Sequence, residues 1–431
     1  MKPTLKVFAA TALSAVVLAP VAACGGGGDG GGGGGGGSEE GLKARGPITY
    51  VQGKDNSNVV RPLVAKWNKA HPDEKVTFKE QTDEADQQHD DLVQHFQAKD
   101  PNYDVVSVDV VWTAEFAAKG WLQPLEGDMA IDTSPFLPAT VKTATYNNKL
   151  YAAPMQTDAG LLYYRKDLVP NPPKTWDEMM ADCKIAEKND MGCYAGQFAK
   201  YEGLTVNAAE AINTAGGSVV GSDGITPTVD SPEAAKGLSA LVEAYKDGNI
   251  PRQAITYTEE EGRIAFEQGK LLFLRNWPYV YSLAKTEKSS KVKDTFGITT
   301  LPGMEGGQVP GASSLGGHNA AISVYSDHKA TAHDFVEFLT NAETEKFYAT
   351  QGSLAPTRGD LYDDPQLVKQ LPYLPVLQKS LENAVPRPVT PYYPAVTKAI
   401  EDNAYAALKG EVGVEQALKQ MSQAIKTASQ S

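Results

Sequence analysis

The chain has 431 residues, of which 41% are hydrophobic and 22% charged, an ordinary composition for a soluble globular protein. This length exceeds one typical compact domain and is sufficient for two hydrophobic cores. The formal net charge of −13, with no basic stripe anywhere, argues against a nucleic-acid partner, because such affinity comes largely from clustered Lys and Arg.

Residues 1–24 are expected to be a targeting segment that is processed during export. Lys2 and Lys6 precede a short apolar stretch, 7–19, that is too brief to span a bilayer permanently and is typical of a signal peptide. Small residues then precede Cys24, which resembles the bacterial lipobox, where the cysteine is lipidated and becomes the new N-terminus. We therefore expect a lipid anchor at Cys24; the alternative is a secreted protein with a chance cysteine at this position.

Residues 25–46 are predicted to form a tether, because glycine fills positions 25–37 except for Asp29 and cannot pack into a core. An exported chain meets an oxidising compartment, so Cys183 and Cys193 are candidates for a disulfide across a short polar loop between helical segments. Two free buried thiols are the alternative. The six histidines are scattered, and none has metal-ligand spacing to the cysteine pair, which disfavours a zinc site.

Strand and helix patterns then alternate along the chain. The expected order is strand 48–51, helix 59–67, strand 76–78, helix 92–96 and strand 103–108. This βαβαβ order predicts an α/β fold with an open, doubly wound sheet, whose ligands bind beyond the carboxyl ends of the strands. Asp55 and Asn56 follow the first strand, and Asp109 and Trp112 follow the third, so we expect them at that edge.

Further elements indicate a second lobe. We predict an extended run at 150–154, a strand at 161–165, a helix capped by Thr175, helices at 234–245 and 260–268, and a buried strand at 271–274. Trp277 comes shortly after the last of these and therefore stands at another strand end. The segment 302–317, rich in glycine and proline, suggests a further change of lobe.

Five longer motifs stand in a characteristic order. They are Tyr-Ala-Ala-Pro at 151–154, Thr-Asp-Ala-Gly-Leu-Leu-Tyr-Tyr-Arg-Lys-Asp-Leu at 157–168, Pro-Lys-Thr-Trp-Asp-Glu-Met at 173–179, Phe-Glu-Gln-Gly-Lys at 266–270 and Arg-Asn-Trp-Pro-Tyr at 275–279. In this order they resemble family 1 extracellular solute-binding proteins of ABC importers, and within them the trehalose/maltose-binding branch with its actinobacterial trehalose-binding lipoproteins. The resemblance runs from about Pro47 to about Met421.

The resemblance implies a two-lobed, periplasmic-binding-protein-like fold, in which each lobe has a doubly wound sheet and the chain crosses the hinge three times. The crossings would fall near Thr157, near 296–298 and near Asn341. The first lobe would then comprise residues 47–157 and 299–341, and the second residues 158–298 and 342–431.

The resemblance also implies which residues contact a sugar. The positions of this chain that match the family's ligand contacts are Asn56, Asp109, Asp158, Glu259, Trp277, Tyr279, Gly316, Gly317 and Arg387. His318 departs from the pattern, since an aromatic residue, commonly Trp, often follows that glycine pair. This departure leaves open which disaccharide fits.

These residue types suit a sugar, which presents hydroxyl groups around faces of C–H bonds: carboxylates, amides and guanidinium groups bind the rim, and flat rings bind the faces. Taken singly, Trp277 has a core aromatic as its alternative, and Asp109, Asp158 and Glu259 have salt-bridged or solvated carboxylates as theirs. We expect a monomeric binding protein without cofactor, metal or nucleic acid, anchored by lipid to the outer face of the bacterial membrane, which captures a disaccharide such as trehalose or maltose and delivers it to an ABC permease.

Three alternatives stay open. The ligand could be another oligosaccharide. Paired carboxylates beside an aromatic ring also describe a secreted glycosidase, although the sequence has no recognised glycosidase motif. A peptide or metal receptor on the same fold is the third alternative, and the scattered histidines disfavour metal.

Overall fold

The computed structural model describes residues 39–430. The predicted signal peptide, Cys24 and the glycine run lie outside these described residues. The end of the predicted tether is folded, because it contains the short helix α1 (Glu39–Leu42). Arg45 then forms ion pairs of 2.9 Å with Glu74 and 2.8 Å with Asp334, so packed structure begins before residue 47.

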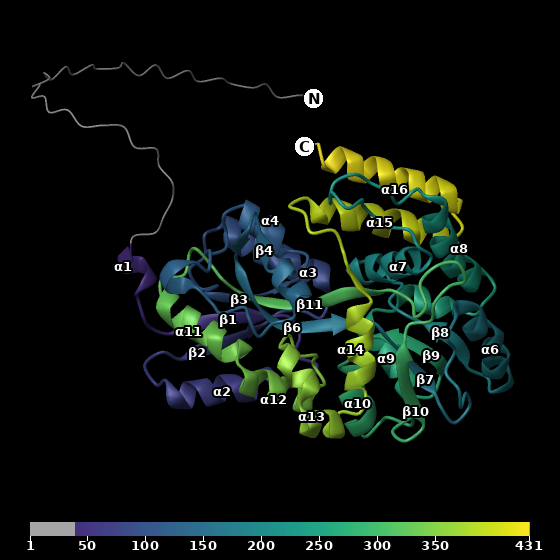
Figure 1. Cartoon of the computed structure of the whole chain (residues 1–431), viewed down its shortest axis with the longest axis horizontal. Helices are drawn as coiled ribbons and strands as arrows, with labels where there is room; N and C mark the ends of the chain where they lie inside the picture. Colours follow the sequence, from purple (N-terminus) through teal and green to yellow (C-terminus); the bar gives the residue numbers. More distant parts are fainter. Residues whose placement is uncertain (1–38, 431) are drawn as a thin grey trace, which may run out of the picture. The chain divides into compact units, whose positions relative to one another are not determined.

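The larger sheet has six strands (Figure 1), and five of them run in the order β12-β11-β3-β1-β2 while β6 pairs with β11. Their bounds are β1 (Ile48–Gln52), β2 (Val76–Glu80), β3 (Val105–Asp109), β6 (Ala152–Ala159), β11 (Ser313–Ile322) and β12 (Ala384–Pro386). β1 pairs in parallel with both β2 and β3, as the βαβαβ pattern predicts. β11 is antiparallel to β3 and to β6.

The second sheet has four strands in the order β10-β7-β9-β8. They are β10 (Phe296–Thr300), β7 (Leu161–Arg165), β9 (Leu271–Asn276) and β8 (Gly192–Ala195). β8 and β9 are parallel, whereas β7 is antiparallel to both β9 and β10. Both sheets are therefore mixed. The two-residue strands β4 (Thr145–Tyr146) and β5 (Lys149–Leu150) form a separate hairpin.

Helices flank both sheets (Figure 1). Around the first sheet lie α2 (Val60–Ala70), α3 (Ala85–Gln97), α4 (Thr113–Ala118), α5 (Pro138–Thr143), α11 (Lys329–Thr340) and α12 (Ala342–Gly352). Around the second lie α6 (Trp176–Lys188), α7 (Glu202–Thr214), α8 (Pro232–Lys246), α9 (Glu259–Glu267), α10 (Val280–Thr286), α15 (Tyr393–Leu408) and α16 (Val414–Ala428). Two further helices, α13 (Pro365–Gln370) and α14 (Leu374–Glu382), follow α12. The α/β class is confirmed.

Local sequence explains several of these boundaries. α6 begins at the predicted cap, where Thr175 and Glu178 form a reciprocal capping box. α2 buries Val60, Leu63, Val64 and Trp67, the apolar side chains at helical spacing. α7 differs, because each of its residues is buried and its sequence has no polar face. Periodicity cannot reveal such a helix.

The chain passes between the two sheets at positions that the strands define. Gly160 separates β6, in the first sheet, from β7, in the second. A Cβ atom there would lie 2.7 Å from a carboxylate oxygen of Glu210, so this close passage requires glycine. Residues 301–312 lead back from β10 to β11, which begins inside the predicted glycine- and proline-rich segment.

The last part of the chain returns to the first sheet. β12 pairs in parallel with β11, and an isolated bridge joins Ala355 to Thr157 of β6. Tyr348 of α12 is buried in the core cluster that contains β1 and α2. The boundary expected near Asn341 assigns these residues to the second lobe, whereas their pairing and burial place them against the first sheet.

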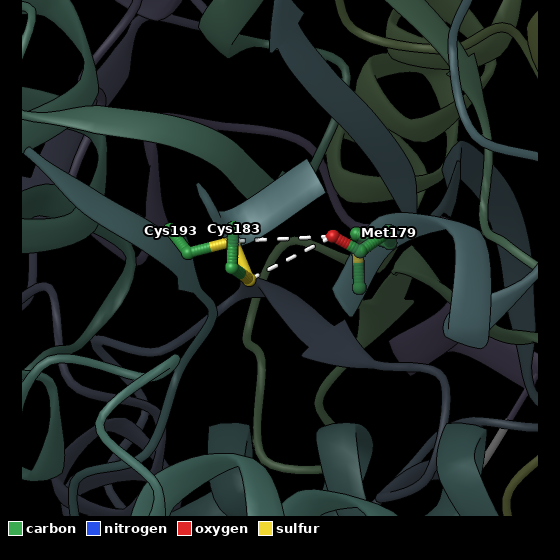
Figure 2. Close-up of a disulfide and its surroundings, with 3 residues drawn as sticks. All are labelled: Met179, Cys183 and Cys193. Atoms are coloured by element: carbon green, nitrogen blue, oxygen red, sulfur yellow. Dashed lines mark hydrogen bonds between the residues drawn. A yellow bond between two sulfur atoms is a disulfide. The ribbon is translucent and has the colours of Figure 1, made fainter. Parts of the chain in front are cut away.

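Cys183 and Cys193 form a disulfide (Figure 2), as the sequence predicts. Cys183 lies on α6 and Cys193 on β8, so the expectation of two helical segments is wrong for the second cysteine. Cys193 is in a strand because Gly192–Ala195 forms hydrogen bonds with β9 and becomes part of the second sheet. The bridge therefore ties a covering helix to an edge strand of the second sheet.

Within residues 39–430, no helix combines the length and the apolar character that crossing a bilayer demands.

Candidate functional site

A cleft with about 1130 Å³ of empty space, part of it open to solvent, is lined by residues of both sheets. All nine predicted ligand positions and His318 line it: Asn56, Asp109, Asp158, Glu259, Trp277, Tyr279, Gly316, Gly317, His318 and Arg387. The structure thus brings together residues that are more than 300 positions apart in the sequence.

Strand ends place most of these side chains. Asn56 follows β1, and Asp109 is the last residue of β3, so both lie at the carboxyl edge of the parallel part of the first sheet. Asp158 and Gly316 face each other in the register between β6 and β11. From the second sheet, Trp277 comes directly after β9.

Trp277 forms one wall of the cleft, and its position is restrained on several sides. The guanidinium carbon of Arg275 lies 3.9 Å from the ring centroid. The indole Nε1 donates to Glu259 over 3.4 Å, and the backbone carbonyl accepts from Tyr163 at 2.8 Å. A Cβ atom on Gly316 would lie 3.0 Å from the six-membered ring, so the glycine leaves room for the indole.

Glu259 and Tyr279 are held by neighbouring side chains. Glu259, the first residue of α9, accepts from the Tyr201 hydroxyl at 2.6 Å and also faces Trp277. Burial raises the pKa of Glu259 above its ordinary value, and these two donors oppose the shift. The Tyr279 hydroxyl donates to Glu260 at 2.6 Å. Both residues are therefore positioned before any ligand arrives.

Arg387 joins two carboxylates that line the cleft, those of Glu202 and Asp109. Its guanidinium donates to Glu202 through one terminal nitrogen and to Asp109 over 3.2 Å through the other. Burial works against the charge on Arg387, but Asp109 and Glu202 outweigh it and raise the pKa of the guanidinium above its ordinary value. The buried Nε has no hydrogen-bond partner among residues 39–430.

Asp158 and His318 also line the cleft, and burial shifts the pKa of each. Burial raises the pKa of Asp158 to about 7, helped by the charge of Asp109 and opposed by Gln156, whose amide donates to it at 3.3 Å. Burial also lowers the pKa of His318 below its ordinary value. A neutral imidazole in place of an indole presents ring nitrogens as well as a flat face.

Gly317 has a backbone conformation that favours glycine. Its φ is +114°, and a Cβ atom would approach the carbonyl oxygen of Gln156 to 2.3 Å. Its own carbonyl accepts from the amide of Val110 at 3.2 Å, beside Asp109. The pair Gly316 and Gly317 therefore lets the β11 backbone form part of the cleft wall.

Two residues that the sequence placed at strand ends have other roles. Trp112 is buried in the hydrophobic core, where its ring packs at 5.4 Å from that of His89, and it does not line the cleft. Asp55 lines the cleft, but its carboxylate accepts from the amides of Val59 and Val60 at the start of α2. Residues at a strand end can therefore hold the start of a helix or fill the core as well as line the cleft.

Sequence reasoning missed Tyr201 and Glu202, which line the cleft at the start of α7. Glu202 accepts from Arg387, from Tyr393 at 2.6 Å and from Thr397 at 2.5 Å. The only sequence signal is an aromatic and acidic pair before a small-residue run, which is not specific for a ligand site.

One carboxylate cluster next to the cleft has the spacing of a cation site. Oxygens of Asp86, Glu202 and Glu401 lie within 4.8 Å of one another. Both oxygens of Glu202 are engaged by Arg387 and by the hydroxyls described above, which argues against a bound divalent cation.

Comparison with known proteins decides the family. Residues 52–346, more than half of the chain, match the family described as bacterial extracellular solute-binding protein. The chain belongs to this family. The family predicted from the order of the motifs is therefore confirmed.

Individual binding proteins of known name are similar to this chain, in agreement with the family assignment. A probable ABC transporter-binding protein of Deinococcus radiodurans is 35% identical over 341 residues, which cover 76% of this chain and 80% of that protein. The galactooligosaccharide-binding protein of Bacillus subtilis is 25% identical over 388 residues, 87% of each chain. The maltose-bound MalE3 structure of T. maritima matches with a TM-score of 0.84 and 34% identity, covering 88% of this chain and 99% of that one. This structural match confirms the two-lobed fold.

Proposed function

We propose that this protein is the substrate-binding component of an ABC sugar importer, anchored by lipid at Cys24 to the outer face of the bacterial membrane. It captures a disaccharide such as maltose or trehalose between two closing lobes and delivers it to the permease. Membership of the solute-binding family supports capture and delivery. Each of the two closing lobes would be built around one of the two sheets.

The observation that carries the sugar proposal is the composition of the cleft. One face of the Trp277 indole is covered by Arg275, so the other face is available as a flat apolar floor. Around it stand Asp109, Asp158 and the orphaned Nε of Arg387, which supply acceptors and a donor for hydroxyl groups. This combination suits a pyranose ring better than a peptide or an ion.

An α-glucosyl disaccharide is the favoured ligand. A relative with 34% identity is known in a maltose-bound form, and the motif order resembles the trehalose/maltose branch. The test is a calorimetric titration of the purified chain with maltose, trehalose, sucrose and cello-oligosaccharides. Saturable binding of maltose or trehalose supports the proposal. Binding restricted to β-linked oligosaccharides would replace the ligand and leave the class intact, whereas heat from none of the sugars would contradict a sugar-binding role.

We propose further that the protein has no glycosidase activity. Asp158, with its pKa raised to about 7, could serve as a general acid. However, Asp109 and Glu259, the carboxylates that would act as its partner, are engaged by Arg387 and by Tyr201. Incubation of the pure protein with maltose or trehalose should release no glucose. Glucose that accumulates in proportion to protein concentration, and disappears with Asp158→Asn, would establish the enzyme instead.

The anchor and the monomeric state need separate measurements. Intact mass of the protein extracted from membranes should show a diacylglyceryl group on Cys24, and Cys24→Ser should release the protein into the medium. Light scattering should give the mass of one chain, because few large apolar side chains are exposed in residues 39–430: Ile225, Ile264, Val309 and Val389.

A further inference from the structure

A buried charged pair lies directly behind the proposed sugar floor. Arg275, on β9, is 0% exposed, and Glu210, on α7, is 5% exposed. Removing two charges from water is unfavourable unless close contact and additional hydrogen bonds compensate for it. The sugar contacts proposed above do not involve either residue, so ligand binding does not account for the burial of this ion pair.

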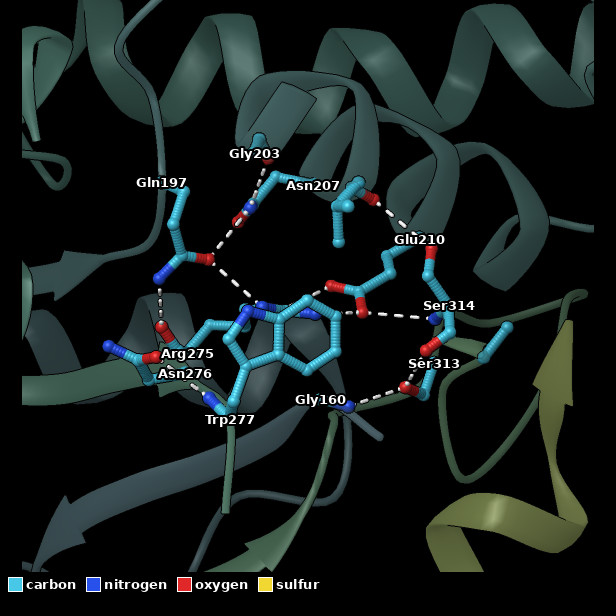
Figure 3. A network of polar contacts seen from close by, with 12 residues as sticks. Gly160, Gln197, Gly203, Asn207, Glu210, Arg275, Asn276, Trp277, Ser313 and Ser314 are labelled. Carbon is cyan, nitrogen blue, oxygen red and sulfur yellow. Dashed lines mark hydrogen bonds and ion pairs between the residues drawn. The ribbon is translucent and has the colours of Figure 1, made fainter. Parts of the chain in front are cut away.

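The guanidinium of Arg275 is fixed in one plane. Glu210 accepts from its Nε at 2.7 Å and from one terminal nitrogen at 2.5 Å, while the side-chain oxygen of Gln197 accepts from the other at 2.9 Å. Gln197 is itself held by Asn207, whose amide donates to it at 3.0 Å. Figure 3 shows this network behind the indole of Trp277. A guanidinium held in this way presents a rigid flat face.

That flat face packs against the indole. The Arg275 guanidinium carbon lies 3.9 Å from the ring centroid of Trp277, within the range of a cation–π contact. Asn276, between them, accepts from the Trp277 amide at 2.8 Å. The backbone and the rear face of Trp277 are therefore both restrained, and the restraint on the ring face comes from Arg275.

The same carboxylate also restrains β11, the strand that carries Gly316. One oxygen of Glu210 accepts from the backbone amide of Ser314 at 3.0 Å, and Ser314 lies on β11 two residues before Gly316. Next to it, the Ser313 hydroxyl accepts from the amide of Gly160 at 2.6 Å, where the chain passes between the sheets. Glu210 thus connects the ring of Trp277, through Arg275, with the strand that carries Gly316.

We propose that Arg275 is a positioning residue for the ligand floor: held by Glu210, its guanidinium sets the orientation of the Trp277 indole relative to β11. Arg275 acts through Trp277 and does not touch the ligand. The proposal deepens the proposed function and relies on it only where a sugar is used as the probe.

The first test needs no ligand. Arg275→Lys keeps the charge but loses the planar face and the two-pronged contact with Glu210. The near-UV circular dichroism that Trp277 contributes, measured as wild type minus Trp277→Ala, should fall to about half or less in Arg275→Lys, because a ring without its rear contact samples several orientations. The matched control is Arg165→Lys, which breaks a similar fork to Asp167 on the same sheet without touching an indole.

The second test is a double-mutant cycle with maltose as the probe. Arg275→Lys should weaken maltose binding about tenfold in the wild-type background, and less than about twofold in Trp277→Ala, because the ring through which it acts is gone. Arg165→Lys should change neither value. If Arg275→Lys does not fold, Glu210→Gln, which keeps the shape and one acceptor oxygen, takes its place in both tests.

The outcomes separate this proposal from the proposed function. Equal loss of maltose affinity in both backgrounds, or an unchanged Trp277 dichroism in Arg275→Lys, would overturn the positioning role. If wild type does not bind maltose, the choice of sugar fails, and the dichroism measurement still decides whether Arg275 orients the ring.

Discussion

At the scale of single residues, the cleft depends on side chains whose contacts are already made within the protein. Trp277 is the residue with the largest apolar surface among the predicted contacts, and Arg387 is the one with the most charged partners. Their substitution should therefore have different consequences. Loss of the indole mainly removes contact with the ligand, whereas loss of the guanidinium also leaves buried carboxylates unpaired.

Trp277→Ala should weaken disaccharide binding by about 1–3 kcal/mol, because it removes the apolar floor against which a sugar ring would pack. Calorimetric titration measures this loss. Trp176→Ala is the control, since Trp176 packs against Tyr194 in the second lobe and does not line the cleft. Wild-type affinity in Trp277→Ala would show that the floor is elsewhere.

Arg387→Ala should lower both ligand affinity and stability, the latter by about 3–5 kcal/mol, because it leaves Glu202 and Asp109 without their buried partner. Urea unfolding measures the stability. Arg387→Met combined with Glu202→Gln should recover part of the stability but not the affinity. A single variant as stable as wild type would mean that the carboxylates do not need the guanidinium.

At the scale of elements, the second lobe is held together by links between its helices and its small sheet. The disulfide between α6 and β8 is one of them, and it closes a loop of ten sequence positions. In Figure 2 the bridge lies beside Met179 of α6, and neither cysteine lines the cleft. Its contribution should therefore be to stability alone.

Replacing both cysteines by serine should lower stability by about 2–3 kcal/mol, since a bridge over a loop of this size restricts the unfolded chain. Thermal unfolding with and without reductant measures the effect, and maltose affinity should stay within about twofold of wild type. Alkylation without reduction, followed by intact mass, should find no modified thiol at these two positions. Two modified thiols would contradict the bridge.

At the scale of the whole molecule, the cleft is shared by two sheets, and a ligand that contacts both stabilises the closed arrangement in proportion to the contacts it gains there. Asp109 and Gly316 belong to the first sheet, and Trp277 follows a strand of the second. Two consequences of closure can be measured in solution.

Maltose should reduce the radius of gyration of wild type in small-angle scattering, because one sugar reaches residues of both lobes only when the lobes approach. Trp277→Ala at the same sugar concentration should show no reduction. Binding without compaction in wild type would place the ligand on one lobe.

Closure should also take up protons at the carboxylate cluster beside the cleft. Asp86 of α3 meets Glu202 of α7 and Glu401 of α15. Burial, followed by the charges of Glu401, Glu202 and Glu84, raises the pKa of Asp86 from 3.8 to about 8. The other titratable groups that line this pocket are His89, Asp90, Tyr393 and Lys398. When the lobes separate, the carboxyl of Asp86 faces water and its pKa returns toward its ordinary value.

Since the closed form holds the proton more tightly than the open form, the stabilisation of closure is present at low pH and is lost as pH rises through about 8. Maltose affinity should therefore fall by about tenfold or more between pH 6 and pH 9. Asp86→Asn should flatten this profile, and Asp90→Asn, at an exposed position of the same helix, should not. A profile that Asp86→Asn leaves unchanged would assign the protons to another group.

Much of this molecule followed from local patterns in the sequence. Apolar spacing predicted the βαβαβ start of the first sheet, Thr175 predicted the beginning of α6, and the order of the motifs indicated the family and the set of residues that meet in the cleft. The elements were accessible because each depends on neighbours within a few turns of helix or one strand, whereas the cleft residues came from the resemblance to the family.

Tertiary structure alone decided what those residues contact. Arg387 forms hydrogen bonds with Glu202 and Asp109, which precede it by 185 and 278 sequence positions. Arg275 forms hydrogen bonds with Glu210, which precedes it by 65 positions. α7, which supplies Glu202 and Glu210, is buried on all sides and has no periodicity to detect. Periodicity reports which side of an element is buried but not which side chain lies opposite, because that partner is set by the packing of distant segments.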